Sequence, residues 1–333
     1  MDQVRWGMIG IGDVAERKSG PGLYKAKGSI LRGIYGRNPQ KAQDFAQRHG
    51  VDIVSDSVDD MLADPMIDAV YMPVPPKFHK EYALRCLEAG KVPYIEKPMA
   101  MNHAECVAIV EKAREKSLPA YVAYYRRSQE RFIKLKEILD SGAIGRLRSV
   151  ELRQIQPPEP ADMDMHNLPW RLDQTVSGGG KFLDMAVHVL DILDFLIGRI
   201  VEVKGFAANL GGLYQVEDTV SASFRFENGV LGSGLWCYVG DHSEELVRIV
   251  GDKGSISFEG MAYGPVTVQD GSTQTVHQFT APEHLGMPYI QSIVDELLGL
   301  GKSPADLKAA VNTTWVADRI LEDYRSSHQS GKE

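Results

Sequence analysis

The sequence has few cysteines: Cys86, Cys106 and Cys237 are widely spaced and form no C-x-x-C pair. An odd number of isolated thiols predicts reduced, structural cysteines rather than a disulfide framework or a zinc knuckle. The sequence also lacks an apolar run near the roughly 18 residues that a membrane-crossing helix needs, and its first residues do not read as a basic export signal. We therefore expect a cytoplasmic protein with no membrane contact.

Positive charge is also in short supply. A total of 37 Lys and Arg stand against 45 Asp and Glu, which gives a formal net charge of -8. Nucleic-acid binding needs clustered basic side chains, and the sequence has no such cluster, so we expect no nucleic-acid partner. The composition, with 43% hydrophobic and 25% charged residues over 333 positions, is typical of a two-domain globular enzyme that acts on a small molecule.

The first motif follows a short apolar run at residues 4–9. The sequence Gly10-Ile11-Gly12-Asp13-Val14-Ala15 matches G-x-G-x-x-A between a predicted strand and a predicted helix at residues 16–27. In this motif the first glycine permits a tight turn, the second lets backbone N–H groups approach a pyrophosphate, and the small third residue allows close packing. The predicted cofactor contacts in this turn are Gly10, Ile11, Gly12, Asp13 and Val14.

The end of the second predicted strand, residues 29–35, indicates which dinucleotide binds. An NAD site usually has an acidic residue there, whereas this chain has Gly36-Arg37-Asn38. Arg37, helped by Lys41, can pair with the 2′-phosphate of NADP. We therefore predict NADP as the preferred cofactor, with NAD possible. The alternative is that Arg37 is only a surface residue before the helix predicted at residues 39–49.

Strands and helices continue to alternate up to residue 123, which predicts a doubly wound parallel sheet, the Rossmann α/β class. One strand ends at Glu96-Lys97-Pro98. Ligands of such sheets bind beyond the carboxyl ends of the strands, so Lys97 is a candidate for chemistry. The alternative is a pair of solvated loop charges. Pro73, Pro75 and Pro76 follow another strand and predict a stiff loop along the nicotinamide half of the cofactor.

The pattern changes after residue 123. A long extended run at residues 147–155 is followed, from residue 204 to 279, by one short strand after another with turn residues between them. This half predicts an α+β domain with a large, mostly antiparallel open sheet, and two amphipathic stretches at 284–300 and 304–324 close the chain. We expect a dinucleotide-binding Rossmann domain at residues 1–123 and a substrate-binding and oligomerisation domain at residues 124–333.

Residues 181–197 predict a buried helix that carries a narrow polar stripe. With about 100° per residue, Lys181, Asp184, His188 and Asp191 fall within one arc of the helix. Such a line of Asp and His indicates the wall of a cleft, although a single histidine is more often a satisfied core residue. A zinc site with His166, Asp184 and His188 is a competing interpretation, but the ligand spacing does not support it, and we predict no metal.

Together, the glycine turn, Glu96-Lys97-Pro98 and the triplet Gly178-Gly179-Gly180 before Asp184 and His188 resemble the Gfo/Idh/MocA family of NAD(P)-dependent oxidoreductases. The resemblance covers the chain from Val4 to about Tyr324. It implies a Rossmann domain followed by a domain whose open sheet often mediates homodimers or homotetramers. Trp170-Arg171-Leu172 is similar to members acting on sugars, including 1,5-anhydro-D-fructose reductase.

The resemblance also implies roles for single residues. Lys97, Asp184 and His188 correspond to the catalytic set, and a cis peptide bond before Pro98 is implied. Trp170 and Arg171 are implied substrate contacts, as is Tyr125, although Tyr125 stands where many members have asparagine. The remaining cofactor contacts implied are Pro73, His79, Glu96 and Lys97.

The chemistry predicted is hydride transfer between the nicotinamide and a secondary alcohol or ketone carbon of a sugar, sugar derivative or cyclitol. A histidine suits proton transfer near neutrality, so His188 is assigned as general base or acid, Lys97 as hydrogen-bond donor to the reacting oxygen, and Asp184 as the group that orients the imidazole. Lys97 and His188 could exchange these roles. Two alternatives stay open: a glycosidase that uses NAD for transient oxidation, and a non-catalytic NADP-binding sensor.

Overall fold

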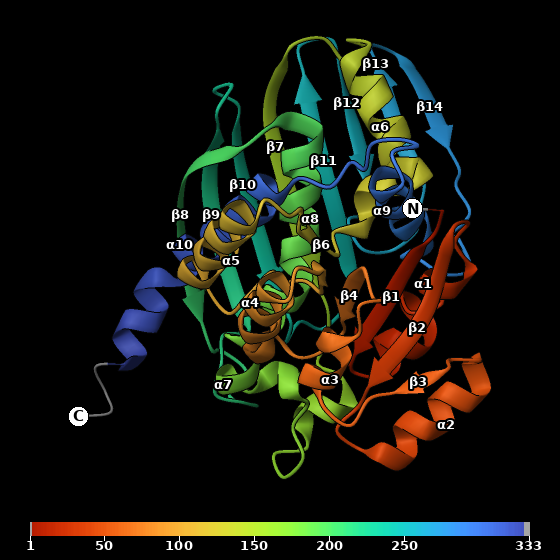
Figure 1. Cartoon of the computed structure of the whole chain (residues 1–333). Coiled ribbons are helices and arrows are strands. Elements are labelled where there is room, and N and C mark those ends of the chain that lie inside the picture. Colours follow the sequence, from red (N-terminus) through yellow and green to blue (C-terminus); the bar gives the residue numbers. More distant parts are fainter. Residues whose placement is uncertain (1, 330–333) are drawn as a thin grey trace. The chain divides into compact units, whose positions relative to one another are not determined.

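The computed structural model describes residues 2–329, and Figure 1 shows the order of their helices and strands. The chain forms two compact units: the first contains the residues up to Gln129 together with Pro282–Val311, and the second contains Glu130–Ala281 and the chain from Asn312 onward. The division does not follow a single cut at residue 123, because the segment 282–311 returns to the first unit. The roles assigned to the two domains stay predictions.

Within the described residues of the first unit, six parallel strands form a sheet in the order β3-β2-β1-β4-β5-β6. This order is that of dinucleotide-binding folds, with the reversal of strand order between β1 and β4. The strands are β1 Val4–Ile9, β2 Ser29–Tyr35, β3 Ile53–Val54, β4 Ala69–Met72, β5 Val92–Ile95 and β6 Tyr121–Val122.

The helix that follows β2 begins and ends at residues with capping chemistry. In α2 (Pro39–His49), the Asn38 side chain accepts a hydrogen bond from the Lys41 N–H at 2.9 Å, and Gly50 ends the helix with φ 64°. The structure confirms the predicted boundaries of α2. The sequence could predict them because the residues that start and end the helix are its immediate neighbours. The other helices are α1 Gly22–Lys25, α3 Val58–Ala63, α4 His79–Glu88, α5 His103–Lys116 and α9 Met287–Leu297, with short turns at Pro76–Phe78 and Tyr125–Ser128.

The expectation of one helix over residues 16–27 is wrong. The chain forms a five-residue π-turn, Val14–Lys18, and then the short helix α1. Gly20 causes the break: a side chain there would overlap the carbonyl oxygen of Ala15, so the backbone folds tightly onto the preceding turn, and Pro21 supplies no N–H to continue a helix.

Aromatic residues fill the core of the first unit on one face of its sheet. The Trp6 ring meets the Tyr94 ring edge-on at 6.0 Å between centroids, and Tyr94 lies 6.2 Å from Tyr289 of α9. Aromatic pairs of this kind bury large apolar areas, and their rings favour edge-to-face or offset arrangements. Gly7 faces the opposite side of the sheet, where the space for a side chain is taken by Met61 of α3. The two faces of the sheet are therefore both covered.

The second unit contains a sheet in the order β14-β13-β12-β11-β7-β10-β9-β8, in which, among the described residues, only the β7–β10 pair is parallel. This confirms the mostly antiparallel sheet predicted from the sequence. Its strands are β7 Leu147–Ile155, β8 Ile200–Ala208, β9 Thr219–Phe226, β10 Leu231–Cys237, β11 Glu244–Gly251, β12 Gly254–Phe258, β13 Val266–Asp270 and β14 Thr273–His277.

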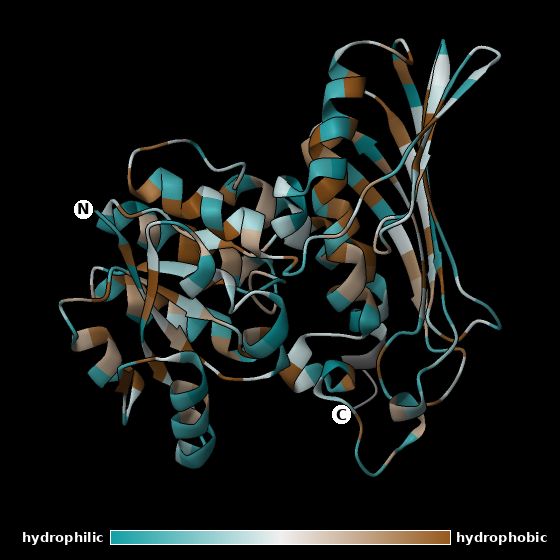
Figure 2. Ribbon diagram, turned by 90° about the vertical axis from the view of Figure 1, so that its right-hand side faces the viewer, coloured by the Kyte–Doolittle hydropathy of each residue, from teal (hydrophilic) through white to brown (hydrophobic). Residues whose placement is uncertain are grey.

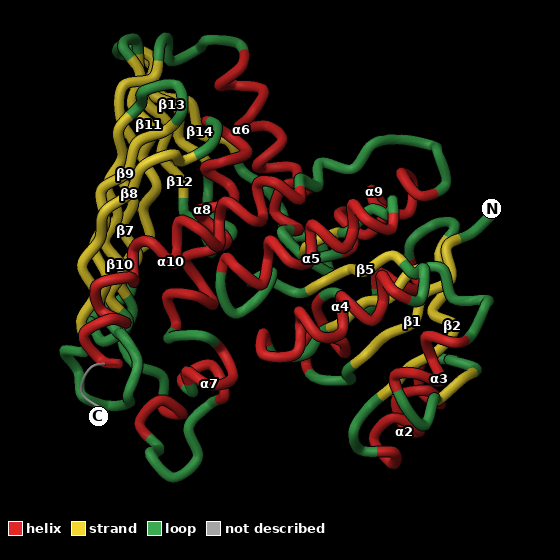
Figure 3. Tube along the Cα trace, turned by 60° about the vertical axis from the view of Figure 1, so that its left-hand side comes forward, coloured by secondary structure: helices red, strands yellow, loops and turns green. Residues whose placement is uncertain are grey.

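Three helices cover one face of this sheet, as Figure 3 shows. In α8 (Lys181–Ile197), Phe182 meets Trp236 of β10 edge-on at 5.0 Å, and in α6 (Glu130–Asp140), Phe132 meets Phe258 of β12 at 6.0 Å. Ile320 of α10 (Leu307–Gln329) occupies the space beside Gly205 of β8. Hydrophobic segments, brown in Figure 2, recur along these helices and strands.

The other face of the sheet carries exposed apolar side chains. Phe206, Leu231 and Leu235 are 80%, 59% and 38% exposed, and they lie on β8 and β10. Single exposed apolar residues are normal, but a group of them on one sheet face indicates a surface suited to association. In the part of the chain that the structure describes, no helix is long and apolar enough to cross a membrane.

Candidate active site

The two glycines of the turn after β1 have different surroundings. Gly10 has φ 107°, and a Cβ atom there would lie 2.9 Å from the carbonyl oxygen of Pro73 and 3.0 Å from Cγ1 of Val74. Gly12 is different, because apart from its two chain neighbours no described residue has an atom within 4 Å of the position that a Cβ atom would take, and Gly12 is exposed. Packing therefore requires glycine at position 10, whereas the open space beside Gly12 leaves room for the pyrophosphate contact that the motif predicts.

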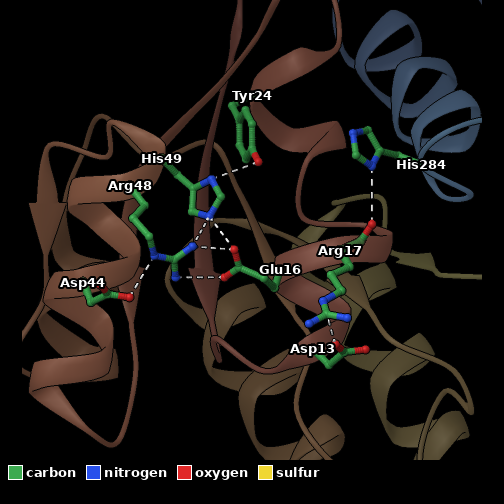
Figure 4. Close-up of polar contacts among 8 residues, drawn as sticks. All are labelled: Asp13, Glu16, Arg17, Tyr24, Asp44, Arg48, His49 and His284. Carbon is green, nitrogen blue, oxygen red and sulfur yellow. Dashed lines mark hydrogen bonds and ion pairs between the residues drawn. The ribbon is translucent and has the colours of Figure 1, made fainter.

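The π-turn after these glycines is held by a group of polar side chains that sequence analysis missed (Figure 4). The Glu16 carboxylate accepts hydrogen bonds from two Arg48 nitrogens at 2.5 and 3.1 Å, and His49 Nε2 lies 2.9 Å from it. The hydroxyl of Tyr24 lies 3.1 Å from His49 Nδ1. The hydrogen bonds from Arg48 are the main cause that lowers the pKa of Glu16 to about 2. The turn is thus fastened to the C-terminal end of α2.

We predict that Glu16→Gln destabilises the protein by about 1 kcal/mol at pH 7, the upper end for a partly exposed ion pair. Because the folded-state pKa is lowered, the stabilisation is present above the ordinary pKa of 4.5 and is lost as the pH falls toward 2. Thermal unfolding of the wild type and the variant from pH 7 to pH 3 measures this difference, which should shrink with acidity. Glu283→Gln is the control, because Glu283 is 82% exposed and lies 3.9 Å from Lys25. A pH-independent difference would contradict the prediction.

The adenosine end of the predicted cofactor site lies after β2. Arg37 is exposed, with its guanidinium carbon 5.9 Å from the centre of the Phe78 ring, and Lys41 is an exposed residue in the first turn of α2. Residues 36–41 contain no carboxylate. The charges available there are both positive, which fits a phosphate better than a lone hydroxyl.

The segment after β5 holds Lys97 on a fixed backbone. Glu96 is buried, and its two carboxylate oxygens accept hydrogen bonds from the Tyr71 hydroxyl at 2.5 Å and from the Lys97 N–H at 3.2 Å. The Lys97–Pro98 peptide bond is cis, which confirms that expectation. Both carboxylate oxygens of Glu96 thus accept hydrogen bonds from the protein, and its contact with the cofactor stays a prediction.

His79 is likewise occupied inside the first unit. It is fully buried, and its two ring nitrogens each lie 2.8 Å from a backbone carbonyl oxygen, Nδ1 from that of Pro98 and Nε2 from that of Val74. Burial lowers the pKa of His79 to about 4, although both carbonyls act in the opposite direction. These contacts connect the loop after β4 to the segment around Lys97, and the direct cofactor contact of His79 stays a prediction. Pro73, in the same loop, contacts the glycine turn.

In the second unit, the glycine triplet lies where only glycine fits. Gly178 ends the short helix α7 (Gln174–Ser177) with φ 87°, and a side chain on Gly180 would overlap the carbonyl oxygen of Glu217. The Gly180 N–H donates to the Glu217 carboxylate at 2.8 Å. Burial raises the pKa of Glu217. Glu217 therefore fixes the start of α8, and no sequence pattern marked it.

The polar stripe of α8 holds two ion pairs with the preceding loop. Lys181 pairs with the buried carboxylate of Asp162, and Asp184 accepts a hydrogen bond from Arg171 Nε at 2.9 Å. The guanidinium carbon of Arg171 lies 4.6 Å from the centre of the Trp170 ring. Trp170 and Arg171, both predicted to contact substrate, thus lie together with Asp184, which is predicted to belong to the catalytic set.

His188 lies one turn further along α8 and is buried. The orientation of its imidazole by Asp184 stays a prediction, as does the approach of Lys97, which belongs to the first unit. Tyr125 also belongs to the first unit, where it packs against the core, and the guanidinium carbon of Arg126 lies 5.6 Å from its ring.

Between residues 2 and 329, no group of three or more His, Cys, Asp or Glu side chains is arranged to hold a metal ion. His166, one of the three residues of the alternative zinc site, is exposed. Its backbone N–H donates a hydrogen bond to the Asp164 carboxylate at 3.1 Å.

Comparison with known proteins identifies the family. Residues 4–124 match the model of an oxidoreductase family with an NAD-binding Rossmann fold, and residues 132–257 match the GFO/IDH/MocA C-terminal domain. The chain belongs to the Gfo/Idh/MocA family of oxidoreductases.

Among its relatives, oxidoreductase P35 of Formosa agariphila is 34% identical over 95% of this chain and 98% of its own length. A 1,5-anhydro-D-fructose reductase of Ensifer adhaerens is 28% identical over 76% of this chain and 74% of its own. A myo-inositol 2-dehydrogenase of Thermotoga maritima is 25% identical over 97% and 98%. These relatives are all named as oxidoreductases, reductases or dehydrogenases, in agreement with the family.

Solved structures confirm the fold. The aldose-aldose oxidoreductase of Caulobacter crescentus has a TM-score of 0.86 at 20% identity and covers 98% of both chains. Levoglucosan dehydrogenase in complex with NADH and levoglucosan has a TM-score of 0.84 at 23% identity, covering 97% of this chain and 98% of its own.

Proposed function

We propose that this protein transfers a hydride between NADP(H) and a secondary alcohol or ketone carbon of a sugar, sugar derivative or cyclitol. The observation that carries the proposal is the group of Trp170, Arg171 and Asp184 beside the glycine triplet, in a chain whose other unit is a dinucleotide-binding fold. The relatives named as an anhydro-fructose reductase and an inositol dehydrogenase support this class of substrate.

The residues of this chain manage the proton and the charge on the reacting oxygen. The nicotinamide, when bound, supplies the hydride chemistry. In alcohol oxidation His188 accepts the hydroxyl proton, and Lys97 donates a hydrogen bond to the oxygen on which negative charge develops. Asp184 orients the imidazole. In ketone reduction the same groups act in reverse, with His188 returning the proton.

The substrate contacts proposed beside these groups are Trp170, Arg171 and Tyr125. Arg171 is held by the Asp184 carboxylate and stacked near Trp170, so its guanidinium has a restricted orientation from which to donate to sugar hydroxyls. The exposed ring of Trp170 presents a flat apolar surface suited to the C–H face of a sugar ring. Tyr125 is carried over from the family resemblance.

A screen of sugars and cyclitols with NAD and NADP, following the absorbance of the reduced nicotinamide, tests this function. We expect reduction of NADP with at least one sugar or cyclitol. Cleavage of a glycosidic bond with a tightly held cofactor and no net reduction would support the glycosidase alternative instead, and binding without turnover would support the sensor.

The preference for NADP predicts the effect of Arg37→Ala. Loss of one charge-assisted, bidentate contact with the 2′-phosphate should raise the dissociation constant of NADPH about 10- to 100-fold. The dissociation constant of NADH should change less than about twofold, because NADH lacks that phosphate. Fluorescence titration with both cofactors measures the two effects. Equal weakening of NADPH and NADH would remove the reason for preferring NADP.

We also propose that two or four copies associate through the exposed face of the second sheet. Phe206, Leu231 and Leu235 supply apolar area on that face, and a sheet face repeated around a two-fold axis is self-complementary. Light scattering in solution measures the number of copies. The cytoplasmic location expected from the sequence stays a prediction.

A further inference from the structure

The backbone on both sides of Lys97 is held by side chains from neighbouring elements of the first unit. Tyr71 lies on β4, next to β5 in the sheet, and His79 is the first residue of α4. Both are fully buried at 0% exposure. No sequence pattern predicts that either residue acts on the segment around Lys97.

Tyr71 acts on the side before Lys97. Its hydroxyl donates to one oxygen of Glu96 at 2.5 Å, and the other oxygen of Glu96 accepts the Lys97 N–H at 3.2 Å. Burial first, and then Glu96, raises the pKa of Tyr71, so the phenol keeps the proton that it donates.

His79 acts on the side after Lys97. Its Nδ1 lies 2.8 Å from the Pro98 carbonyl oxygen, and its Nε2 lies 2.8 Å from the Val74 carbonyl oxygen. Val74 in turn borders the space beside Gly10 of the cofactor turn. The lysine segment is therefore connected to the loop that touches the glycine turn.

We propose that Tyr71 and His79 are positioning residues: they fix the segment Glu96–Pro98 and so aim the Lys97 ammonium group, without touching substrate themselves. The inference rests on the proposed function of Lys97. A donor must lie within hydrogen-bond distance of the oxygen on which charge develops, and a displacement of about 1 Å can lower the rate on the order of 100-fold. The hydrogen bonds of Tyr71 with Glu96 and of His79 with the Pro98 carbonyl limit such a displacement on both sides of Lys97.

Tyr94 provides a matched control for ordinary core packing. Its ring stacks on that of Tyr71, with centroids 4.8 Å apart, and it is equally buried. Its hydroxyl has no hydrogen-bond partner among the described residues. Tyr94→Phe and Tyr71→Phe therefore remove the same atom from the same layer, but only the second removes a hydrogen bond to Glu96.

The experiment compares kcat, KM, the dissociation constant of NADPH and the thermal midpoint for Tyr71→Phe, Tyr94→Phe and His79→Leu. We expect Tyr71→Phe and His79→Leu to lower kcat about 10- to 100-fold with NADPH affinity within about twofold, and Tyr94→Phe to leave kcat within about twofold. Unchanged kcat in Tyr71→Phe, or an equal loss in Tyr94→Phe, would overturn the role of Tyr71. If Tyr71→Phe does not fold, His79→Leu decides by the same criteria.

A double-mutant cycle shows whether these residues act through Lys97. In the Lys97→Met background, followed as slow single-turnover hydride transfer, Tyr71→Phe should cause no further loss. An equal fold loss in both backgrounds would mean that Tyr71 acts elsewhere and would overturn the inference. A Lys97→Met protein with the full wild-type rate would instead overturn the proposed function of Lys97, so the two failures can be told apart.

Discussion

Replacing Lys97 with methionine is expected to lower kcat for hydride transfer about 100- to 1,000-fold, the loss typical for removing one donor to a developing oxyanion. Methionine has nearly the length of lysine but no charge and no donor, so the backbone around the cis peptide bond keeps its contacts. The affinity for NADPH should stay within a fewfold, because the ammonium group is assigned to the reacting oxygen. Stopped-flow absorbance and fluorescence titration measure the two quantities.

Lys77→Met is the control for this variant. Lys77 is an exposed lysine in the turn Pro76–Phe78, so its replacement removes a positive charge from the same unit without touching the segment after β5. Wild-type rates in Lys77→Met and a large loss in Lys97→Met would support the assignment. A Lys97→Met enzyme as fast as the wild type would refute it.

Replacing His188 with asparagine should lower kcat about 100- to 10,000-fold, the range for loss of a general acid or base. Asparagine keeps a similar size and can still hydrogen-bond on the buried face of α8, but it cannot carry a proton between the substrate and solvent. The dependence of kcat on pH near neutrality should also disappear. His242→Asn, in the exposed turn between β10 and β11, is the control.

The two variants together decide which group transfers the proton. If His188 is the acid and base, the pH dependence near neutrality is lost in His188→Asn and kept, at a lower rate, in Lys97→Met. The reverse result would exchange the two roles. Normal turnover in His188→Asn would contradict the catalytic role and would mean that His188 is only a buried residue of the core.

Much of the fold could be predicted because the signals are local. The bounds of α2 follow from Asn38, Pro39 and Gly50, and α8 was expected at the residues where it lies. Each of these signals acts over one or two turns of chain. The interruption at Gly20 is also local, because the Ala15 carbonyl lies five residues earlier and Pro21 has no N–H to continue a helix, so the expectation of a helix at residues 16–27 overlooked a signal that the sequence contains.

The other features that the sequence did not predict depend on contacts between residues that are far apart in the chain. The sequence predicted an amphipathic segment near residues 284–300, but its place in the first unit depends on Tyr289 meeting Tyr94, nearly two hundred residues earlier. In the same way, no sequence pattern predicts that Asp184 accepts a hydrogen bond from Arg171, whereas the orientation of His188 by Asp184 stays a prediction. Glu217 had no signal at all.

By itself, the sequence determined the alternation of strands and helices, the glycine turn, the lysine at the end of β5 and the family, because periodicity, capping and turn chemistry depend on neighbouring residues. Only the tertiary structure decided what each polar side chain contacts. Hydrogen bonds form over about 3 Å, and the partners of Glu16, Glu96, His79 and Glu217 come within that distance only when separate elements pack together.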